Sequence, residues 1–298
     1  MKIELATAPV SWGVVMKDTP NVPPYSQVLD EMSEAGYKGT ELGPYGYLPL
    51  DQSQLRDELD SRGLTLISAY VPVNLVDLQA QAETYKEALT VVRLLSDMGC
   101  KLVTLSDFLF APHKRSKRAG RIRPEDGLDE TGWQHFIKNI AEFAKMCDLE
   151  LGLKAAFHPH VGSWIETARE IDRLMAETDP TYLGLCPDTA HTTYGGHDPV
   201  ALIKRYPDRI RHLHIKECDK TVLAQVLARK GDYFDGVVSQ VFPELGRGSV
   251  DFKAIHKTLA EINFSGWAVI EQDILPDSGL NAFESAHHNL TYLKNAGW

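Results

Sequence analysis

Residues 182–217, YLGLCPDTAHTTYGGHDPVALIKRYPDRIRHLHIKE, contain the repeating unit that decides the fold. Residues 182–187 are short and mostly apolar, which is typical of a parallel strand buried on both faces. Residues 200–206 follow Asp198-Pro199, a helix N-cap with proline at the first helical position. Residues 210–216 form a second strand-like run. The segment therefore predicts a strand, a crossover helix and a second, parallel strand.

The same alternation extends over the whole chain of 298 residues. We expect strands at 3–9, 37–42, 64–71, 101–106, 149–157, 182–187, 210–216 and 267–272. We expect helices at 28–35, 55–61, 82–98, 133–147, 167–175, 200–206, 252–262 and 282–296. Eight alternations favour an α/β fold, a single-domain (β/α)8 TIM barrel over residues 1–298. A doubly wound open sheet is the alternative, but the glycine-rich phosphate loop that usually accompanies it is missing from the sequence.

Composition and charge narrow the class of protein. The formal net charge is -10, which disfavours binding to nucleic acid. The four cysteines include no CxxC pair, and no apolar run approaches the length of a membrane span. The start of the chain lacks a secretory leader pattern, so we expect a cytoplasmic protein without membrane partners. A homo-oligomer is compatible with the sequence.

Two long connections, at about 107–131 and 218–250, follow the fourth and seventh expected strands. Both leave the carboxyl ends of strands, where barrels build active sites, so we expect them over the mouth of the barrel. The first contains a basic run at 113–123. This run is either a solvated loop or a lid that touches a polar ligand.

Ligand-type side chains gather at the carboxyl ends of the expected strands. They are Trp12, Glu41, Asn74, Asp107, His158, His160, Asp188, His191, His214, Lys216, Glu217, Glu271 and Asp273. Each alone has an ordinary structural explanation, such as a helix N-cap for Asp188 or core packing for Trp12. In a barrel, however, these strand ends converge on one mouth.

Three of these residues predict a metal site. Asp188, His214 and Glu271 end the last three expected strands and offer mixed oxygen and nitrogen ligands. Glu271 follows an apolar strand, so its carboxylate needs a buried partner. Mn²⁺, Co²⁺, Mg²⁺ and Zn²⁺ all suit such a set, and we favour Mn²⁺ or Co²⁺. The absence of a thiolate disfavours a structural zinc site.

The chain resembles the xylose-isomerase-like TIM barrels, which include sugar-phosphate isomerases and epimerases. The resemblance rests on CPDTAH at 186–191, LHIKE at 213–217, GRGSVDF at 246–252 and VIE at 269–271. It implies that Asp188, His214 and Glu271 bind a metal and that His191 touches substrate. The family usually has a glutamate at the end of the fifth strand, where this sequence has His158. We expect His158 as the fourth ligand and His160 as the proton carrier, although either imidazole could take either role.

Within that family the chain is similar to the inosose dehydratases. The carriers are APVSWG at 8–13, GTELG at 39–43, YLP at 47–49, FHPHVGS at 157–163 with Glu166, and HTTYGGHDP at 191–199. The resemblance implies loss of water from a cyclic keto-polyol such as 2-keto-myo-inositol through a metal-stabilised enediolate. It implies acid-base work by His160 and His191, enediolate stabilisation by Lys216, and a sugar face lined by Trp12 and Glu41.

Three other functions stay open at this point. One is an isomerase or epimerase, which would use the same metal but give the enediolate another fate. Another is a lyase of 3-keto-glycosides, which a wide hydrophobic pocket mouth or a partner subunit would favour. The third is a metal-binding barrel without catalysis. A related barrel family cleaves DNA at abasic sites, but the acidic charge disfavours that activity here.

Overall fold

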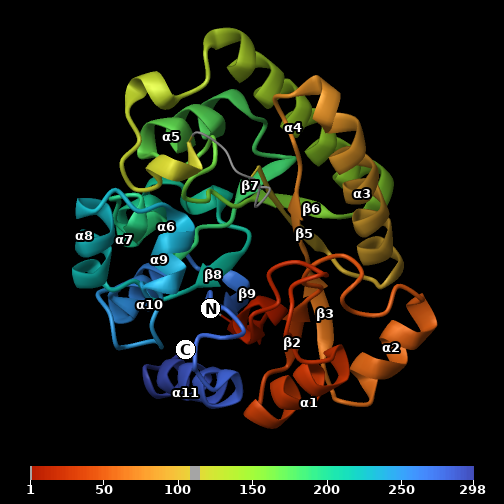
Figure 1. Ribbon diagram of the computed structural model, residues 1–298. Coiled ribbons are helices and arrows are strands. Elements are labelled where there is room, and N and C mark those ends of the chain that lie inside the picture. Colours follow the sequence, from red (N-terminus) through yellow and green to blue (C-terminus); the bar gives the residue numbers. More distant parts are fainter. Residues whose placement is uncertain (1, 108–114) are drawn as a thin grey trace.

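The structure is a computed structural model that describes residues 2–107 and 115–298, without the side chains of residues 78–80. Its strands all run parallel, and they lie inside a ring of helices (Figure 1). The strands are β1 (Lys2–Thr7), β2 (Gly39–Glu41), β3 (Thr65–Ser68), β4 (Tyr70–Pro72), β5 (Leu102–Ser106), β6 (Lys154–Phe157), β7 (Leu183–Leu185), β8 (Leu213–Ile215) and β9 (Ser265–Ile270).

The helices of the described residues follow these strands around the outside. They are α1 (Tyr25–Ala35), α2 (Gln52–Asp60), α3 (Leu78–Asp97), α4 (Glu130–Leu151), α5 (Ala168–Glu177), α6 (Thr189–Tyr194), α7 (Pro199–Arg205), α8 (Lys220–Ala228), α9 (Tyr233–Val238), α10 (Phe252–Glu261) and α11 (Ala282–Asn295). Short 3₁₀ helices lie at Pro9–Trp12, Ser116–Arg118, Pro124–Asp126 and Pro207–Arg209. None of the helices in these two described stretches is long and apolar enough to cross a membrane.

The strands form a closed barrel. One sheet has the order β3-β2-β1-β9-β8 and the other the order β4-β5-β6-β7. Only Ala69 separates β3 from β4, so together they form one strand of the barrel, as the sequence predicted. At the other seam, Arg211 N–H donates to Leu185 O and His214 N–H donates to Pro187 O, both at 3.0 Å. The prediction of a TIM barrel is therefore confirmed, and an open sheet is ruled out.

The predicted boundaries were wrong in two places. Residues 149–151, predicted as strand, are the last turn of α4. The helix ends at Gly152, which has the positive φ of 66° that favours glycine and turns the chain into β6. The connection at 218–250, predicted as a long loop, contains α8 and α9. Asp219 and Asp232 begin these helices by accepting N–H bonds from Thr221 and Asp235.

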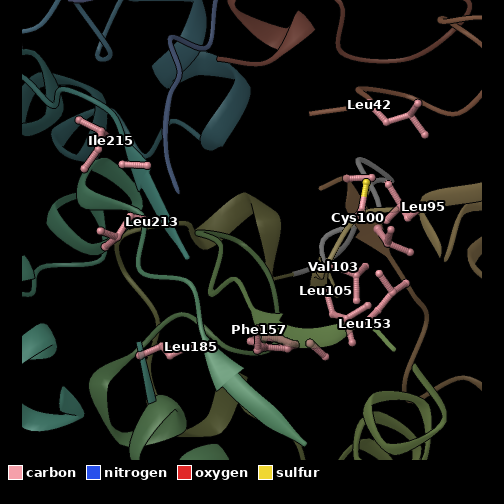
Figure 2. Close-up of a cluster of buried hydrophobic side chains, with 14 of the residues drawn as sticks. Leu42, Leu95, Cys100, Val103, Leu105, Leu153, Phe157, Leu185, Leu213 and Ile215 are labelled. Carbon is pink, nitrogen blue, oxygen red and sulfur yellow. The ribbon is translucent and has the colours of Figure 1, made fainter. Parts of the chain in front are cut away.

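The apolar core lies between the strands and the helices. Figure 2 shows Leu95 of α3 and Cys100 close to Val103 and Leu105 of β5, and these side chains are all buried. On the inside of the barrel the next side chains are polar, since successive residues of a strand face opposite sides. Thr104 Oγ1 of β5 lies 3.0 Å from Ser68 Oγ and 3.3 Å from Glu41 Oε1.

The first long connection lies partly outside the described residues, because His113 and Lys114 of the basic run are among those not described. Arg115 is only 1% exposed, so the expectation of a solvated loop is wrong for this residue. Its guanidinium Nη2 lies 2.6 Å from Glu170 Oε1, and its Nε donates to Ser163 O. Arg115 thus joins this connection to the segment that follows β6. All four cysteines are buried and unpaired.

Candidate active site

The alternation of β8 places three polar side chains at the barrel mouth. Leu213 and Ile215 belong to the core between strands and helices. His212, His214 and Lys216 alternate with them and therefore face the opposite way, into the barrel. All three are at most 2% exposed. The same two-residue alternation directs Glu271 and Asp273 into the barrel at the end of β9. It also directs His158 and His160 into the barrel at the end of β6.

Three buried polar atoms without hydrogen-bond partners meet at this mouth. They are Asp188 Oδ2, His158 Nε2 and His214 Nδ1. The carboxylate oxygen lies 3.6 Å from His158 Nε2, and one ligand atom from each of the three residues falls within 4.8 Å of the others. Glu271 Oε2 lies 3.0 Å from His214 Nδ1 without the angle of a hydrogen bond. Lys216 Nζ lies 3.5 Å from Asp188 Oδ2, but none of the three atoms has a hydrogen bond. Buried atoms of this kind are costly unless a cation satisfies them, so the set fits a divalent metal.

The two oxygens of Asp188 have different surroundings. Its Oδ1 accepts N–H bonds from Ala190 at 2.8 Å and His191 at 2.7 Å, which begins α6. The helix N-cap and the metal ligand, which the sequence left as alternatives, are therefore both compatible with this side chain. The two N–H bonds hold the carboxylate in place, and Oδ2 stays directed toward His158.

Glu41 lies behind His214. Its Oε1 is 3.4 Å from His214 Nε2 and 3.1 Å from His212 Nε2. A carboxylate that bonds the second ring nitrogen of a metal-binding histidine fixes the orientation and tautomer of that ring. Glu41 also lines the cavity described below, and this position is compatible with its predicted contact with substrate. Of the two candidate three-residue metal groups, the one with Glu41, His212 and His214 is already joined by hydrogen bonds.

The charges around His214 favour a cation. Burial alone would lower the pKa of His214, but the carboxylates of Glu271 and Glu41 outweigh it and raise that pKa well above its usual value. In contrast, burial lowers the pKa of His158. A positive charge between Glu271 and Glu41 is thus stabilised. Without a metal, the protonated His214 ring supplies this charge, and a bound divalent ion would displace that proton.

Lys216 is an ammonium ion among carboxylates. Its Nζ lies 2.6 Å from Asp273 Oδ1, 3.2 Å from Glu271 Oε2 and 3.5 Å from Asp188 Oδ2. Burial would lower the pKa of Lys216, but these carboxylates raise it above its usual value. Its carboxylate neighbours along the chain, Glu217 and Asp219, are not its ion-pair partners. Glu217 instead accepts backbone N–H bonds from Gly246, Ser249 and Val250.

His160 and His191 face each other beside Lys216. Their ring centroids are 3.8 Å apart, and His191 Nε2 lies 3.5 Å from Lys216 Nζ. Burial lowers the pKa of both imidazoles well below the usual value; His158 lowers the pKa of His160 further, and His160 lowers that of His191. Both rings are therefore neutral near pH 7, the form that can accept a proton.

Two residues of this mouth were not assigned a role from the sequence. Tyr233 of α9 donates its hydroxyl to Asp273 Oδ2 at 2.8 Å, and its ring lies 4.9 Å from that of His160. Asp273 is two residues beyond Glu271, and the sequence placed it among the strand-end side chains without a role. Tyr233 carried no such signal, because it begins a helix in a stretch that was predicted as loop.

The segment after β6 that carries His158 and His160 is held from behind by buried carboxylates. Glu166 accepts N–H bonds from Gly162 at 2.6 Å and Gly120 at 2.8 Å. Asp107 Oδ2 accepts from Trp164 N–H at 2.6 Å. Burial raises the pKa of Glu166 to about 7 and that of Asp107 to about 6.

Trp12 is placed away from these groups. It is 2% exposed, belongs to the apolar core, and donates its Nε1 hydrogen to Glu31 Oε2 of α1 at 2.6 Å. The described residues that line the cavity do not include Trp12. Its position matches core packing, which the sequence left as the alternative to a sugar-facing role.

A cavity of about 560 Å³ opens at this end of the barrel. Its polar wall comes from the strand ends and α9 and comprises Glu41, His158, His160, His191, His214, Lys216, Tyr233, Glu271 and Asp273. Asp188 lies just beneath this wall at 1% exposure. The volume is in the usual range for a small-molecule site, and its polar groups converge at one end.

A closed parallel barrel with metal-type ligands at the carboxyl ends of its strands defines a class of protein. The sequence profile described as "Xylose isomerase-like TIM barrel" matches residues 29–295. The chain belongs to this family, which confirms the resemblance drawn from its motifs.

Individual relatives are similar over nearly the full length. Inosose dehydratase of Geobacillus kaustophilus (strain HTA426) is 34% identical over 295 residues, which cover 98% of this chain and 92% of the relative. Among solved structures, the IOLI protein with a binding zinc atom has a TM-score of 0.72 at 15% identity, covering 98% of this chain and 97% of that one. The probable 3-DHS dehydratase AsbF from Bacillus anthracis has a TM-score of 0.71 at 15% identity, covering 98% and 99%. The two structures support the fold.

Proposed function

We propose that this enzyme is a metal-dependent dehydratase, a carbon-oxygen lyase that removes water from a cyclic keto-polyol such as 2-keto-myo-inositol. The observation that carries the proposal is the meeting of unpaired metal-type atoms, a buried ammonium and two neutral imidazoles at one end of a cavity. The similarity to inosose dehydratase supports the choice of reaction and of substrate class.

Asp188, His158, His214 and Glu271 would hold the metal. Their oxygen and nitrogen atoms suit Mn²⁺ or Co²⁺, and also Mg²⁺ or Zn²⁺. The bound ion would supply Lewis acidity toward the substrate carbonyl oxygen. His158 is preferred over His160 as the fourth ligand. Its Nε2 faces Asp188 at 3.6 Å, whereas His160 Nδ1 lies 2.7 Å from Val161 O.

The chain's own residues would handle the proton and the charge. His160 or His191, neutral at pH 7, accepts the proton from the carbon next to the ketone. The Lys216 ammonium stabilises the negative charge that develops on the ketone oxygen. The protonated imidazole then returns its proton to the hydroxyl on the β-carbon as the C–O bond breaks. One carbon-bound hydrogen and one hydroxyl leave together as water, and the double bond remains in the ring.

The connection at 218–250 contributes to the mouth in this proposal. Tyr233 and Phe234 of α9 line the cavity, and Tyr233 reaches Asp273 across it. The part of the other connection that would bear most directly on the lid hypothesis, residues 108–114, lies outside the described residues. In the proposal, residues 218–250 cover part of the mouth through α9.

The experiment tests the requirement for metal and the proton transfer by His160 separately. The metal is removed by chelation and restored as Mn²⁺, Co²⁺, Mg²⁺ or Zn²⁺, and scyllo-inosose is assayed by the absorbance of the dione and by the mass of the product. We expect turnover that depends on the metal. His160→Asn should keep the metal content and lose most turnover. A metal-loaded enzyme that converts the substrate to an isomer of unchanged mass would instead establish the isomerase or epimerase alternative.

A second candidate function is favoured by a specific feature of the cavity. Much of its described lining is apolar, with Val14, Val71 and Val91 among the residues. Such a pocket suits a 3-keto-glycoside, in which the same proton abstraction is followed by loss of an alcohol. The released group distinguishes the two functions, since a dehydratase forms water and a glycoside lyase frees the alcohol.

A further inference from the structure

Lys216 lies within ion-pair distance of two oxygens that the proposed metal would need. Its Nζ is 3.2 Å from Glu271 Oε2 and 3.5 Å from Asp188 Oδ2. An ammonium that moved closer to these oxygens would neutralise them in place of the metal. A lysine and a metal ion cannot both occupy this position, because like charges repel strongly where water is excluded. The metal site therefore needs another partner for the lysine.

Of the carboxylates that contact this ammonium, Asp273 lies nearest. Its Oδ1 accepts a hydrogen bond from Lys216 Nζ at 2.6 Å, a shorter distance than either of the other two contacts. Asp273 is 7% exposed and Lys216 is 2% exposed, so water and salt screen this pair only weakly. Among the described residues, the candidate three-residue metal groups do not include Asp273. The lysine is thus drawn toward a carboxylate that the metal does not need.

The second oxygen of Asp273 is held by Tyr233. The tyrosine hydroxyl donates to Asp273 Oδ2 at 2.8 Å, and the side chain that carries it is buried. Tyr233 is the first residue of α9, and Asp232 forms the N-cap of this helix. The tyrosine ring packs against that of His160, with 4.9 Å between the ring centroids. Helix α9 therefore fixes the carboxylate that holds the lysine.

The charges agree with this division of partners. The three carboxylates that contact the ammonium carry three negative charges. The ammonium and a divalent ion together carry three positive charges. Two of the carboxylates are balanced by the ion, and the third is balanced by the lysine. Without Asp273, the ammonium would have only the metal ligands as carboxylate partners, and a buried charge without a partner is costly.

We infer that Asp273 and Tyr233 are positioning residues that hold the Lys216 ammonium beside the metal site and out of it. They act through the lysine, which stays where it can face the ketone oxygen of a substrate. The inference rests on the proposed function, because that function supplies the metal. It gives a role to two residues that take no part in the proposed proton transfer.

The experiment is a double-mutant cycle on metal affinity. Mn²⁺ binding to the metal-stripped protein is measured by competition with a chelating dye. The four proteins have aspartate or asparagine at 273 and lysine or methionine at 216. Asp273→Asn should weaken Mn²⁺ binding by at least about tenfold when Lys216 is present, because the ammonium then pairs with the metal ligands. In the Lys216→Met background the same substitution should change the affinity by less than about threefold.

Tyr233→Phe tests the other positioning residue with a smaller change. It keeps the ring and removes the hydroxyl that bonds Asp273, so Mn²⁺ binding should weaken by about threefold, and only when Lys216 is present. Tyr37→Phe is the matched control, because Tyr37 is also buried and donates its hydroxyl to Ala286 O at 2.9 Å. That variant should bind Mn²⁺ like the wild type. If Asp273→Asn does not fold, the Tyr233→Phe cycle decides the question.

The outcomes distinguish this inference from the function beneath it. Equal weakening in both lysine backgrounds would mean that the carboxylate acts on the ion through its own charge, which overturns the inference. Unchanged Mn²⁺ binding in Asp273→Asn overturns it as well, and neither result affects the dehydratase proposal. The expected cycle in a protein that does not dehydrate scyllo-inosose supports the inference and overturns the dehydratase. A wild-type protein that binds no Mn²⁺ overturns both.

Discussion

The polar and apolar sides of the cavity are built in different ways. The polar side comes mainly from strand ends, where His158, Lys216 and Glu271 lie within hydrogen-bonding or ligand distance of neighbouring groups. The apolar side draws on loops and helices, where Val14 and Val237 do no more than pack. Strand ends are fixed by the barrel, whereas loops and helix faces vary freely. In the proposed function, the reaction depends on the residues at the strand ends.

The largest expected effect comes from removing a metal ligand on the polar side. Asp188→Asn should lower kcat/KM by at least about 10³-fold, or about 4 kcal/mol, because Oδ2 is replaced by a group that binds cations poorly. Metal content by mass spectrometry should fall with activity. Asp198→Asn, which changes the exposed carboxylate at the start of α7, is the matched control and should retain both. Full activity in Asp188→Asn would remove this residue from the site.

The second-largest effect is a dependence of the free energy of unfolding on pH, which is due to Glu166. Burial raises its pKa from 4.5 to about 7, so the folded protein keeps a proton that the unfolded chain has lost. The stability from this group is complete below about pH 4.5 and is lost as the pH rises through about 7. Between pH 5 and pH 8 the loss should be about 2 to 3 kcal/mol.

Glu166→Gln provides the measurement, since glutamine does not titrate. As the pH rises from 5 to 8, the wild type should lose about 2 to 3 kcal/mol of free energy of unfolding relative to the variant. Denaturant unfolding at both pH values gives the two differences. Glu34→Gln, an exposed carboxylate on α1, should show no such trend. A constant difference for Glu166→Gln would mean that this carboxyl is already ionised at pH 5.

A smaller effect tests what Glu41 does. If it orients His214, Glu41→Gln should weaken metal binding by about 10- to 100-fold, as measured by competition with a chelating dye. Thr104→Val, which removes the 3.3 Å contact to Glu41 together with the 3.0 Å contact to Ser68 Oγ, should change the affinity by less than about threefold. A raised KM with unchanged metal affinity would instead support contact with the substrate, as the sequence suggested.

The smallest effect belongs to the apolar side. Val71→Ala should cost about 1 kcal/mol in free energy of unfolding, because the lost methyl groups already border open space. Metal content should not change. Thermal unfolding and metal analysis together check this, and a loss of metal in Val71→Ala would show that the two sides are not independent.

The sequence predicted the barrel because its signals are local and repeated. Each strand is short and apolar, and each helix ends near a glycine or begins at a capping residue, as at Asp198. The error at residues 149–151 has a physical cause. The run Leu149-Glu150-Leu151 is compatible with helix and strand alike, and the position of Gly152 decides where the helix ends.

The candidate site was predictable where it depends on strand periodicity. His158, Asp188, His214, Lys216 and Glu271 all lie at one mouth, as expected from their places at strand ends. The different surroundings of the two Asp188 oxygens and the position of Glu41 behind His214 were not predictable, because they depend on which oxygen faces which neighbour. The burial of Arg115 was not predictable, because nothing in a basic run indicates that Glu170, 55 residues later, lies against it.

The pairing of the first strand with the last has a consequence for synthesis of the chain. Residues Lys2–Thr7 pair with Ser265–Ile270 along their whole length, so the N-terminal strand has a free edge until the final strand is made. At about 5 to 20 residues per second, roughly 13 to 50 seconds separate the two events. During that time the edge of β1 is open to other chains, and a nascent barrel halted before residue 265 would be prone to aggregate.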